Sequence, residues 1–250
     1  MKKPSNIIGV IPARYASSRF PGKLLADLEG VSVLQRVYQQ AMAAGRLAGV
    51  YIATDDQRIY EHAASFGAKV FMTSPDIDNG TKRCHAALAQ ISELAVHGVI
   101  NIQGDEPFIR PDEIDAMADA LRQAGGQIVT LATRITDRAV FEDPHTVKLV
   151  KDRMDRAMYF SRQPIPHIGG SLTGEVELWA HIGMYGFRVE VLHEIVELPA
   201  SALEQLENLE QLRWLENGYH IRVIQTTHEH IGIDTPEDLV RARQIMREAL

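Results

Sequence analysis

The chain has 250 residues, 45% of them hydrophobic and 24% charged, as in an ordinary soluble globular protein long enough to bury a core. Its formal net charge of −7 at pH 7 argues against a general nucleic-acid or anionic-membrane surface. The single cysteine, Cys84, excludes an intrachain disulfide and a cysteine-based zinc cluster, and no apolar run approaches the roughly 20 residues that span a bilayer. With no signal-peptide pattern either, we predict a cytoplasmic enzyme.

The first half of the chain alternates strand-like and helix-like segments. Strands are expected at Ile7–Ile11, Gly49–Thr54, Ala68–Met72, Gly98–Gln103 and Gln127–Thr133. Helices are expected at about Val33–Ala43, Arg58–Phe66 and Lys82–Leu94, and in a segment opened by Pro111. Pro12 cannot donate to a sheet, so pairing of the first strand is expected to end there. Such βα units predict a parallel sheet with right-handed crossovers.

The pattern changes between about residues 134 and 188. Short apolar segments there are separated by connections rich in Pro and Gly, and we interpret the region as an inserted β-rich lobe, able to close over a substrate or to form a dimer face. Helical periodicity returns at Leu203–Glu216, and a strand at His220–Gln225 and a last helix follow. We therefore predict one α/β domain over residues 1–250, with a doubly wound, mostly parallel sheet and an inserted lobe at about 134–188.

A basic loop follows the first predicted strand. It carries Arg14, Arg19 and Lys23 and no acid, although the chain is acidic overall. Ligands of open α/β sheets bind at the carboxyl ends of strands, and Arg and Lys bind phosphate oxygens, so the loop predicts a phosphate-chain site. The loop does not match the Walker A spacing, and the chain has no G-x-G-x-x-G. The alternative is a solvated loop whose arginines pair with Asp27 or Glu29.

Two acids are candidate metal ligands. Asp105 follows an apolar strand on the same predicted sheet edge as the basic loop. Mg²⁺ takes few protein carboxylates and completes its coordination with substrate phosphates and water, which suits this position. Asp234 is the second candidate, although an acid just before a helix can serve the helix dipole alone. Spacing does not show whether the two acids meet.

With these features in view, the sequence resembles a known family, the bacterial 3-deoxy-manno-octulosonate (Kdo) cytidylyltransferases, or CMP-Kdo synthetases. The matching segments occur in the family's order over nearly the whole chain: IPARYASSRFPGKLL, YIATDD, FMTSPD followed by GT-R, INIQGDEP, YFSRQPIP, HIGMYGFR, LENLEQLRWLENG and GIDTPEDL. The resemblance implies a Rossmann-like nucleotidyltransferase fold. It also implies transfer of CMP from CTP to Kdo for lipopolysaccharide biosynthesis, with release of pyrophosphate and with Mg²⁺ as cofactor.

The resemblance further implies a role for individual residues, position by position. The nucleotide-binding positions are Arg14, Ser17, Arg19, Lys23, Gly80, Thr81 and Gln103. Lys23 and Arg14 would stabilise charge at the α-phosphorus. Asp105 and Asp234 would bind the metal ion, and the resemblance counts Asp105 as catalytic together with Lys23 and Arg14. The sugar-acid pocket is matched by Arg162, His181, Tyr185, Glu210 and Gln211, and by Gln103 as well. Arg162 is the cation expected for the sugar carboxylate, whereas spacing alone makes Glu210 an ordinary acid on a helix surface.

One segment departs from the family's usual Ser-Gly-Thr-Asp/Glu-Arg. This chain has Asn79-Gly80-Thr81-Lys82-Arg83, and a lysine near a helix start is unfavourable to the helix dipole. Whether the departure changes the choice of nucleobase stays open at this point. The alternatives are a cytidylyltransferase for another acidic sugar, such as sialic acid or amino-Kdo, and a non-catalytic nucleotide-binding module. Leucines at 206, 209, 212 and 215 and the inserted lobe suggest a homodimer, but core packing explains them as well.

Overall fold

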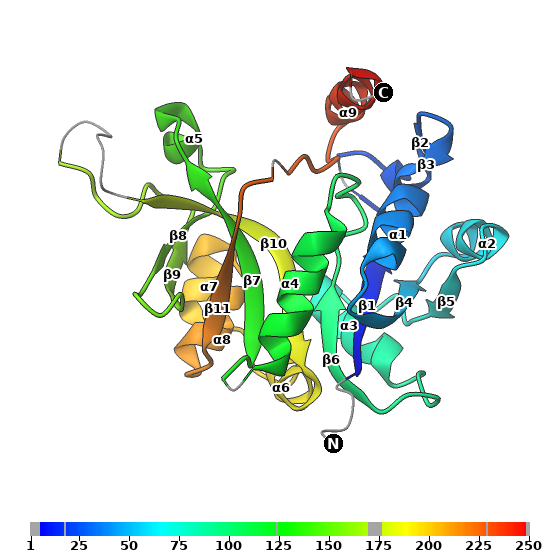
Figure 1. Cartoon of the computed structure of the whole chain (residues 1–250), viewed down its shortest axis with the longest axis horizontal. Coiled ribbons are helices and arrows are strands. Elements are labelled where there is room, and N and C mark those ends of the chain that lie inside the picture. The colour runs from blue at the N-terminus through cyan, green and yellow to red at the C-terminus, as the bar shows by residue number, and fades with distance from the viewer. Residues whose placement is uncertain (1–5, 18, 124, 170–176, 229, 249–250) are drawn as a thin grey trace. The chain divides into compact units, whose positions relative to one another are not determined.

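The computed structural model describes residues 6–17, 19–123, 125–169, 177–228 and 230–248. The chain forms two compact units, a first unit of residues 1–118 with 229–250 and a second unit of residues 119–228. The chain passes from the first unit to the second within helix α4 (Pro111–Arg122) (Figure 1). In the described part of the chain, no helix is both long and apolar enough to cross a membrane.

The first unit contains a parallel sheet in the order β6-β1-β4-β5. The strands are β1 (Asn6–Ala13), β4 (Leu47–Thr54), β5 (Lys69–Met72) and β6 (Val96–Asn101). Strand β1 lies between two neighbours, and its central residues are fully buried, as its continuous apolar sequence predicts. A small antiparallel hairpin, β2 (Asp27–Leu28) with β3 (Val31–Ser32), stands apart from this sheet.

The expected end of β1 at Pro12 is wrong. The strand continues to Ala13, with Pro12 in register with Ala53 of β4. Its pairing with β6 stops at Val10, so beyond that residue the strand pairs with β4. Because proline lacks only a donor, it is tolerated where a strand has a partner on one side.

The helices of the first unit follow the predicted pattern with one correction. They are α1 (Val33–Ala43), α2 (Gln57–Ser65), α3 (Gly80–Leu88), α9 (Pro236–Glu248) and a short 3₁₀ turn η1 (Lys23–Leu25). Helix α3 ends at Leu88 and not at Leu94. The chain leaves it through turns in which Gln90 and Ile91 donate to carbonyls three residues back, which buries Ile91.

The second unit has a mixed sheet. Its strands are β7 (Ile128–Ile135), β8 (Lys148–Lys151), β9 (Ala157–Ser161), β10 (Leu178–Arg188) and β11 (Ile221–Thr226). Strand β11 runs parallel to β7, whereas the pairs β7–β10, β10–β8 and β8–β9 are antiparallel. The helices are α5 (Arg138–Glu142), α6 (Val189–Ile195), α7 (Ala202–Glu207) and α8 (Gln211–Glu216). The predicted lobe at 134–188 falls inside this unit and stays a prediction.

The expected single helix at 203–216 is wrong. Asn208 ends α7 with φ 53°, a left-handed conformation that Asn tolerates better than most residues, and α8 begins only at Gln211. The break separates the leucines of the predicted stripe. Leu209 and Leu212 are buried, while Leu206 is 82% exposed, so the leucines do not form one continuous face.

Candidate active site

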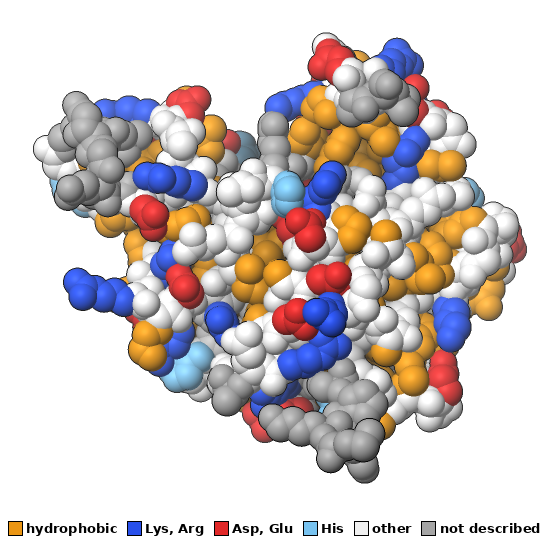
Figure 2. Space-filling model, in the orientation of Figure 1, with side chains coloured by type: hydrophobic (Ala, Val, Ile, Leu, Met, Phe, Trp, Pro, Cys, Tyr) orange, Lys and Arg blue, Asp and Glu red, His pale blue; other side chains and the backbone are white. Residues whose placement is uncertain are grey.

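The basic loop lines a cavity of about 350 Å³ in the first unit. The cavity lies where β1 and β6 end and where α3 begins, which is the carboxyl edge expected for a ligand site. The structure brings six of the predicted residues to its wall: Arg14, Ser17, Lys23, Gly80, Gln103 and Asp105. On the face drawn in Figure 2, positive and negative side chains are intermixed.

The shape of the basic loop depends on Tyr15, which the sequence analysis missed. The Tyr15 carbonyl accepts the N–H groups of Ser17 and Gly22, both at 3.0 Å. Gly22 has φ 74°, and a Cβ at this position would lie 3.0 Å from the Tyr15 ring. On the ring itself, the Arg58 guanidinium lies 3.3 Å from the centroid. Tyr15 is therefore enclosed by the loop and by α2, which fixes the loop.

Lys23 joins the two predicted metal ligands. Its Nζ lies 2.5 Å from Asp105 Oδ2 and 2.9 Å from Asp234 Oδ1, although Asp234 is 211 positions away in the sequence. Burial disfavours the ammonium, but the two carboxylates outweigh it and raise the pKa of Lys23. The Ile233 N–H also donates to the Asp105 carbonyl at 2.9 Å, so the two acid-bearing segments are tied through the backbone.

The described residues contain no group of three or more His, Cys, Asp or Glu side chains arranged to hold a metal ion. The carboxylates of Asp105 and Asp234 nevertheless lie close enough to share the ammonium of Lys23. Mg²⁺ is bound in nucleotide sites by one or two carboxylates plus substrate phosphates, so this pair fits that ion.

The alternative for the basic loop, pairing of its arginines with Asp27 or Glu29, is wrong. The Arg14 Nε lies 3.7 Å from Asp55, and Arg19 Nη2 lies 2.9 Å from the Asp234 carboxylate. The carbonyl of Asp27 and the carboxylate of Glu29 bind arginines of helix α9 instead. The loop arginines thus face the predicted site.

The segment that carries Asp234 passes close to the Glu106 side chain at Gly232. A Cβ on Gly232 would lie 3.0 Å from a carboxylate oxygen of Glu106, the residue next to Asp105. Burial and the neighbouring Asp105 charge raise the pKa of Glu106 to about 7. His230, with Nε2 2.9 Å from Glu113 Oε1, anchors the same segment. The sequence analysis assigned no role to Glu106 or His230, because their contacts are long-range.

In the segment Asn79–Arg83, which departs from the family pattern, the first residue still caps the helix that follows. Asn79 Oδ1 accepts the Lys82 N–H at 2.8 Å and so caps α3 in the manner of a serine. The Lys82 ammonium lies 3.1 Å from the Asp78 carboxylate on the surface, and Lys82 does not line the cavity. The unexpected lysine is therefore balanced by an acid one helical turn away.

Arg83, the last residue of that segment, is fully buried and lines the cavity. It pairs with Asp55 at 2.8 Å and donates to the Ile77 carbonyl at 3.1 Å. Its place in the GT-R segment could have identified it as a site residue. Thr81 is also buried, at 2% exposure, but does not line the cavity.

In the second unit, His181 and Tyr185 lie on β10 with their ring centroids 5.3 Å apart. Burial lowers the pKa of His181 to about 3, so its ring is neutral at pH 7, and Nε2 lies 3.0 Å from Thr130 Oγ1. Burial and the nearby Glu210 carboxylate raise the pKa of Tyr185. The Trp214 ring meets Tyr185 edge-on at 5.0 Å.

The start of helix α8 contributes Glu210 and Gln211. Glu210 is half-buried and lies 3.4 Å from Arg213, so it is not the exposed helix acid that spacing alone suggests. Gln211 Nε2 and Trp214 Nε1 are buried donors with no hydrogen-bond partner in the described part of the chain. Unpaired buried donors are costly, so these groups favour a polar ligand here.

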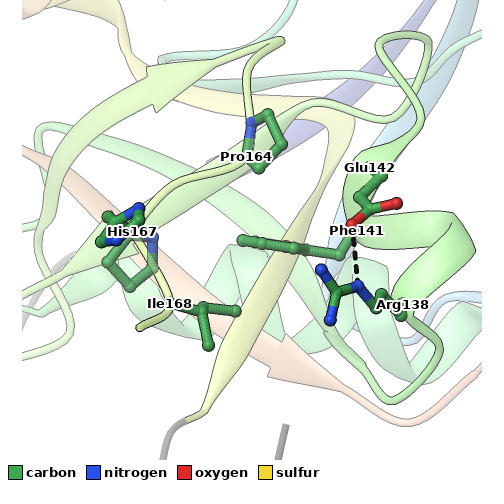
Figure 3. Close-up of a pocket in the computed structure, with 7 residues that line it drawn as sticks. Arg138, Phe141, Glu142, Pro164, His167 and Ile168 are labelled. Atoms are coloured by element: carbon green, nitrogen blue, oxygen red, sulfur yellow. Dashed lines mark hydrogen bonds and ion pairs between the residues drawn. The ribbon is translucent and has the colours of Figure 1, made fainter. Parts of the chain in front are cut away.

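A separate cavity of about 210 Å³ lies between α5 and the connection after β9. Figure 3 shows the Phe141 ring extending toward Ile168 and Pro164, with the Arg138–Glu142 ion pair beside it. Phe141 belongs to a small core cluster against which Ile168 packs. None of the predicted sugar-site residues lines this cavity.

A cavity at the carboxyl edge of a parallel sheet, with cations and Asp105 on its wall and with Asp234 joined to Asp105 through Lys23, defines a nucleotide-binding α/β enzyme of the nucleotidyltransferase class. The sequence matches the cytidylyltransferase family over residues 8–227. The chain belongs to the cytidylyltransferases.

Two related sequences and one solved structure show which cytidylyltransferases the chain is similar to. The chain is 48% identical to the 3-deoxy-manno-octulosonate cytidylyltransferase of Parabacteroides distasonis, over 94% of this chain and 96% of that protein. It is 44% identical to the enzyme of the same name from Porphyromonas gingivalis, over 97% of each. A solved structure of CMP:2-keto-3-deoxy-manno-octonic acid synthetase complexed with CTP has a TM-score of 0.92, with 37% identity, 98% of this chain and 100% of that chain covered. The predicted α/β fold with a mostly parallel sheet, the resemblance to Kdo cytidylyltransferases and the enzyme class are confirmed.

Proposed function

We propose that the chain transfers CMP from CTP to Kdo and releases pyrophosphate. The observation that carries the reaction type is Lys23, which lines the cavity beside Asp105 and is ion-paired with both Asp105 and Asp234. The sugar follows from the near-full-length similarity to Kdo cytidylyltransferases. In the reaction, the anomeric hydroxyl oxygen of Kdo forms a bond to the α-phosphorus of CTP. The bond from that phosphorus to the pyrophosphate oxygen breaks, and the hydroxyl proton passes to solvent.

The side chains of the first unit position the triphosphate and stabilise its charge. Arg14, Ser17, Arg19 and Lys23 bind phosphate oxygens, with Lys23 and Arg14 at the α-phosphorus, while Gly80, Thr81 and Gln103 contact the rest of the nucleotide. Such transfers depend mostly on positioning and electrostatic stabilisation, which suits a loop fixed by its own backbone hydrogen bonds. Asp105 and Asp234 would hold Mg²⁺, which when bound neutralises phosphate charge and lowers the pKa of an attacking hydroxyl.

The side chains of the second unit bind the sugar acid. Arg162 pairs with the carboxylate, and Tyr185, Glu210 and Gln211 bind hydroxyl groups. His181 acts through a hydrogen bond and not through charge, because its pKa of about 3 keeps the ring neutral at pH 7. The buried unpaired donor of Gln211 supports this assignment, since a sugar hydroxyl would supply the missing acceptor.

We also propose that the enzyme works in the cytoplasm as a homodimer. A nucleoside triphosphate substrate and a buried cysteine, Cys84, that forms no disulfide both suit a reducing compartment. The second unit exposes Met154 and Met158, each at 64%, which a partner subunit could cover. Sedimentation of the purified chain tests the dimer, and a monomer at micromolar concentration would contradict it.

Pyrophosphate release from CTP and Kdo, with and without Mg²⁺, tests the proposed reaction. A panel with amino-Kdo, sialic acid and UTP separates this proposal from transfer to another sugar or from another base. Asp105→Asn is expected to reduce turnover by about 10²-fold or more while the fold is kept. Asp119→Asn, which removes an ion-paired acid from α4, is the matched control. Absence of pyrophosphate with every sugar acid would favour the non-catalytic module.

A further inference from the structure

Arg162, the predicted partner of the sugar carboxylate, is surrounded by hydrogen bonds that fix both its backbone and its side chain. It follows directly after β9. Its Nε donates to the Glu207 carbonyl at 3.0 Å, and its Nη1 donates to the Pro144 carbonyl at 3.3 Å. Both acceptors are neutral, so these contacts orient the guanidinium without cancelling its charge. A guanidinium has five N–H donors, and these two contacts use only two of them, so others can serve an anion.

Glu207 accepts three hydrogen bonds here, two from Arg162 and one from Ser161. One of its carboxylate oxygens accepts the Ser161 hydroxyl at 2.6 Å, and the other accepts the Arg162 N–H at 2.9 Å. Its carbonyl takes the Arg162 Nε, as described above. Glu207 ends α7, and the last carbonyls of a helix lack partners within the helix, which explains why this carbonyl can serve another residue.

The arrangement of Glu207 has a chemical consequence. A carboxylate that paired with the Arg162 guanidinium would compete with the carboxylate of a substrate. Here both carboxylate oxygens accept hydrogen bonds from the β9 end, one from Ser161 and one from the Arg162 backbone. The acid therefore stabilises the position of Arg162 and leaves its positive charge for a ligand.

Lys148 fixes the other side of the same residue. It lies on β8 in register with Ser161 and is fully buried. Its ammonium donates to the carbonyls of Asp143 and Thr146, at 2.8 and 2.6 Å, and to the carbonyl of Arg162 at 2.5 Å. An ammonium has three donors, so the three carbonyls satisfy it. A buried charge is expensive, and a methionine would fill similar space without that penalty.

We propose that Lys148 and Glu207 are positioning residues that hold Arg162 in the orientation that binds the carboxylate of the acidic sugar. The inference rests on the proposed function, in which Arg162 is that cation. Glu207 fixes the N–H of Arg162 and Lys148 fixes its carbonyl, so the peptide groups on both sides of the residue are held. Loss of either contact should weaken sugar binding and leave nucleotide binding intact.

A double-mutant cycle tests this proposal. Glu207→Gln, Arg162→Ala and the double variant are compared for the KM of Kdo, the KM of CTP and kcat. Glu207→Gln alone is expected to raise the KM for Kdo about tenfold and to leave the KM for CTP within about twofold. In the Arg162→Ala background the same change should raise the KM for Kdo less than about twofold, because the residue that it positions is gone.

Matched controls separate positioning from general damage. Glu216→Gln removes an exposed carboxylate from α8, and Lys151→Met removes an ammonium from the same strand as Lys148. Neither should change the KM for Kdo, whereas Lys148→Met should raise it about tenfold. Thermal melting shows whether Lys148→Met is folded. If it is not, the double-mutant cycle of Glu207→Gln and Arg162→Ala alone tests whether Arg162 is held in position.

The outcomes distinguish the inference from the proposed function. No turnover of Kdo or another acidic sugar by the unaltered chain overturns the proposed function itself. Turnover combined with equal effects of Glu207→Gln in both backgrounds overturns the positioning role alone. A rise in the KM for CTP as large as that for Kdo also overturns it. A Kdo-specific effect that vanishes without Arg162 supports it.

Discussion

Replacing His181 by Asn is expected to flatten the pH dependence of folding stability between pH 7 and pH 5. The ring packs against Phe160 and Tyr185, and burial lowers the pKa of His181 to about 3. In the unfolded chain, the same imidazole titrates near pH 6.5. As the pH falls below 6.5, the unfolded state therefore binds a proton that the folded state does not, and the free energy of unfolding decreases.

The size of the effect follows from the two pKa values. Complete linkage would remove about 2 kcal/mol between pH 7 and pH 5, at 1.4 kcal/mol for each pH unit well below 6.5. The His181 side chain is only partly shielded from solvent, so we expect about 1–2 kcal/mol. The loss should continue until the pH approaches 3, where the folded state also takes up the proton.

Urea unfolding at pH 5, 6 and 7 measures this difference. The quantity to compare is the free energy of unfolding of the unaltered chain minus that of His181→Asn, because the subtraction cancels the titration of groups common to both proteins. This difference should decrease as the pH falls. A flat difference for His181→Asn would refute the argument that the folded chain keeps this imidazole neutral.

Three further substitutions test the first unit. Lys82→Glu should leave the preference for CTP over UTP unchanged and shift the free energy of unfolding by less than about 0.5 kcal/mol, because repulsion from its present ion-pair partner opposes a better helix dipole. Gly22→Ala should raise the KM for CTP about tenfold more than the control Gly30→Ala does. Both glycines have positive φ, but only at Gly22 would a Cβ meet the Tyr15 ring. Lys23→Met should strengthen Mn²⁺ binding about tenfold in calorimetry, because the ammonium competes for the same carboxylates.

Each of these expectations has a result that would count against it. A changed base preference after Lys82→Glu would place that lysine near the base. Equal effects of alanine at the two glycines would mean that the ring contact does not shape the loop. Arg14→Met removes a charge from the same loop without touching the two carboxylates, so an equal gain in Mn²⁺ affinity there would reduce the Lys23 effect to general electrostatics.

Local patterns predicted much of the fold. The limits of α1 match the structure because its apolar spacing and its Ser32 cap are local signals. The break at Asn208 escaped prediction, since leucine spacing continued through it and only the backbone angle shows the turn. The continuation of β1 through Pro12 escaped prediction too, since a proline is accepted there only because that end of β1 pairs with β4 and not with β6.

The residues of the candidate site also fall into two groups, those that the local sequence predicts and those that only tertiary contacts reveal. The basic loop and Asp105 could be found because they follow apolar strands directly. That Asp234 meets Lys23 is a tertiary contact that no spacing encodes. Tyr15 and Glu207 were missed although both lie in segments that match the family, because their side chains do not resemble ligand-binding groups and their roles appear only in the folded contacts: Tyr15 with Gly22 and Arg58, and Glu207 with the Arg162 backbone.

The charges around the first cavity suggest why the proposed reaction would need a metal. Four cations and three carboxylates are in ion-pair contact there: Arg14, Arg19, Lys23, Arg83, Asp55, Asp105 and Asp234. A triphosphate thus meets a nearly balanced site, and not the unopposed basic loop that the sequence predicts. A divalent cation on the two aspartates would supply the missing positive charge, so metal and nucleotide should strengthen each other's binding. Removing Mg²⁺ with EDTA should therefore weaken CTP binding in calorimetry as well as stop turnover, and an unchanged Kd for CTP would contradict this argument.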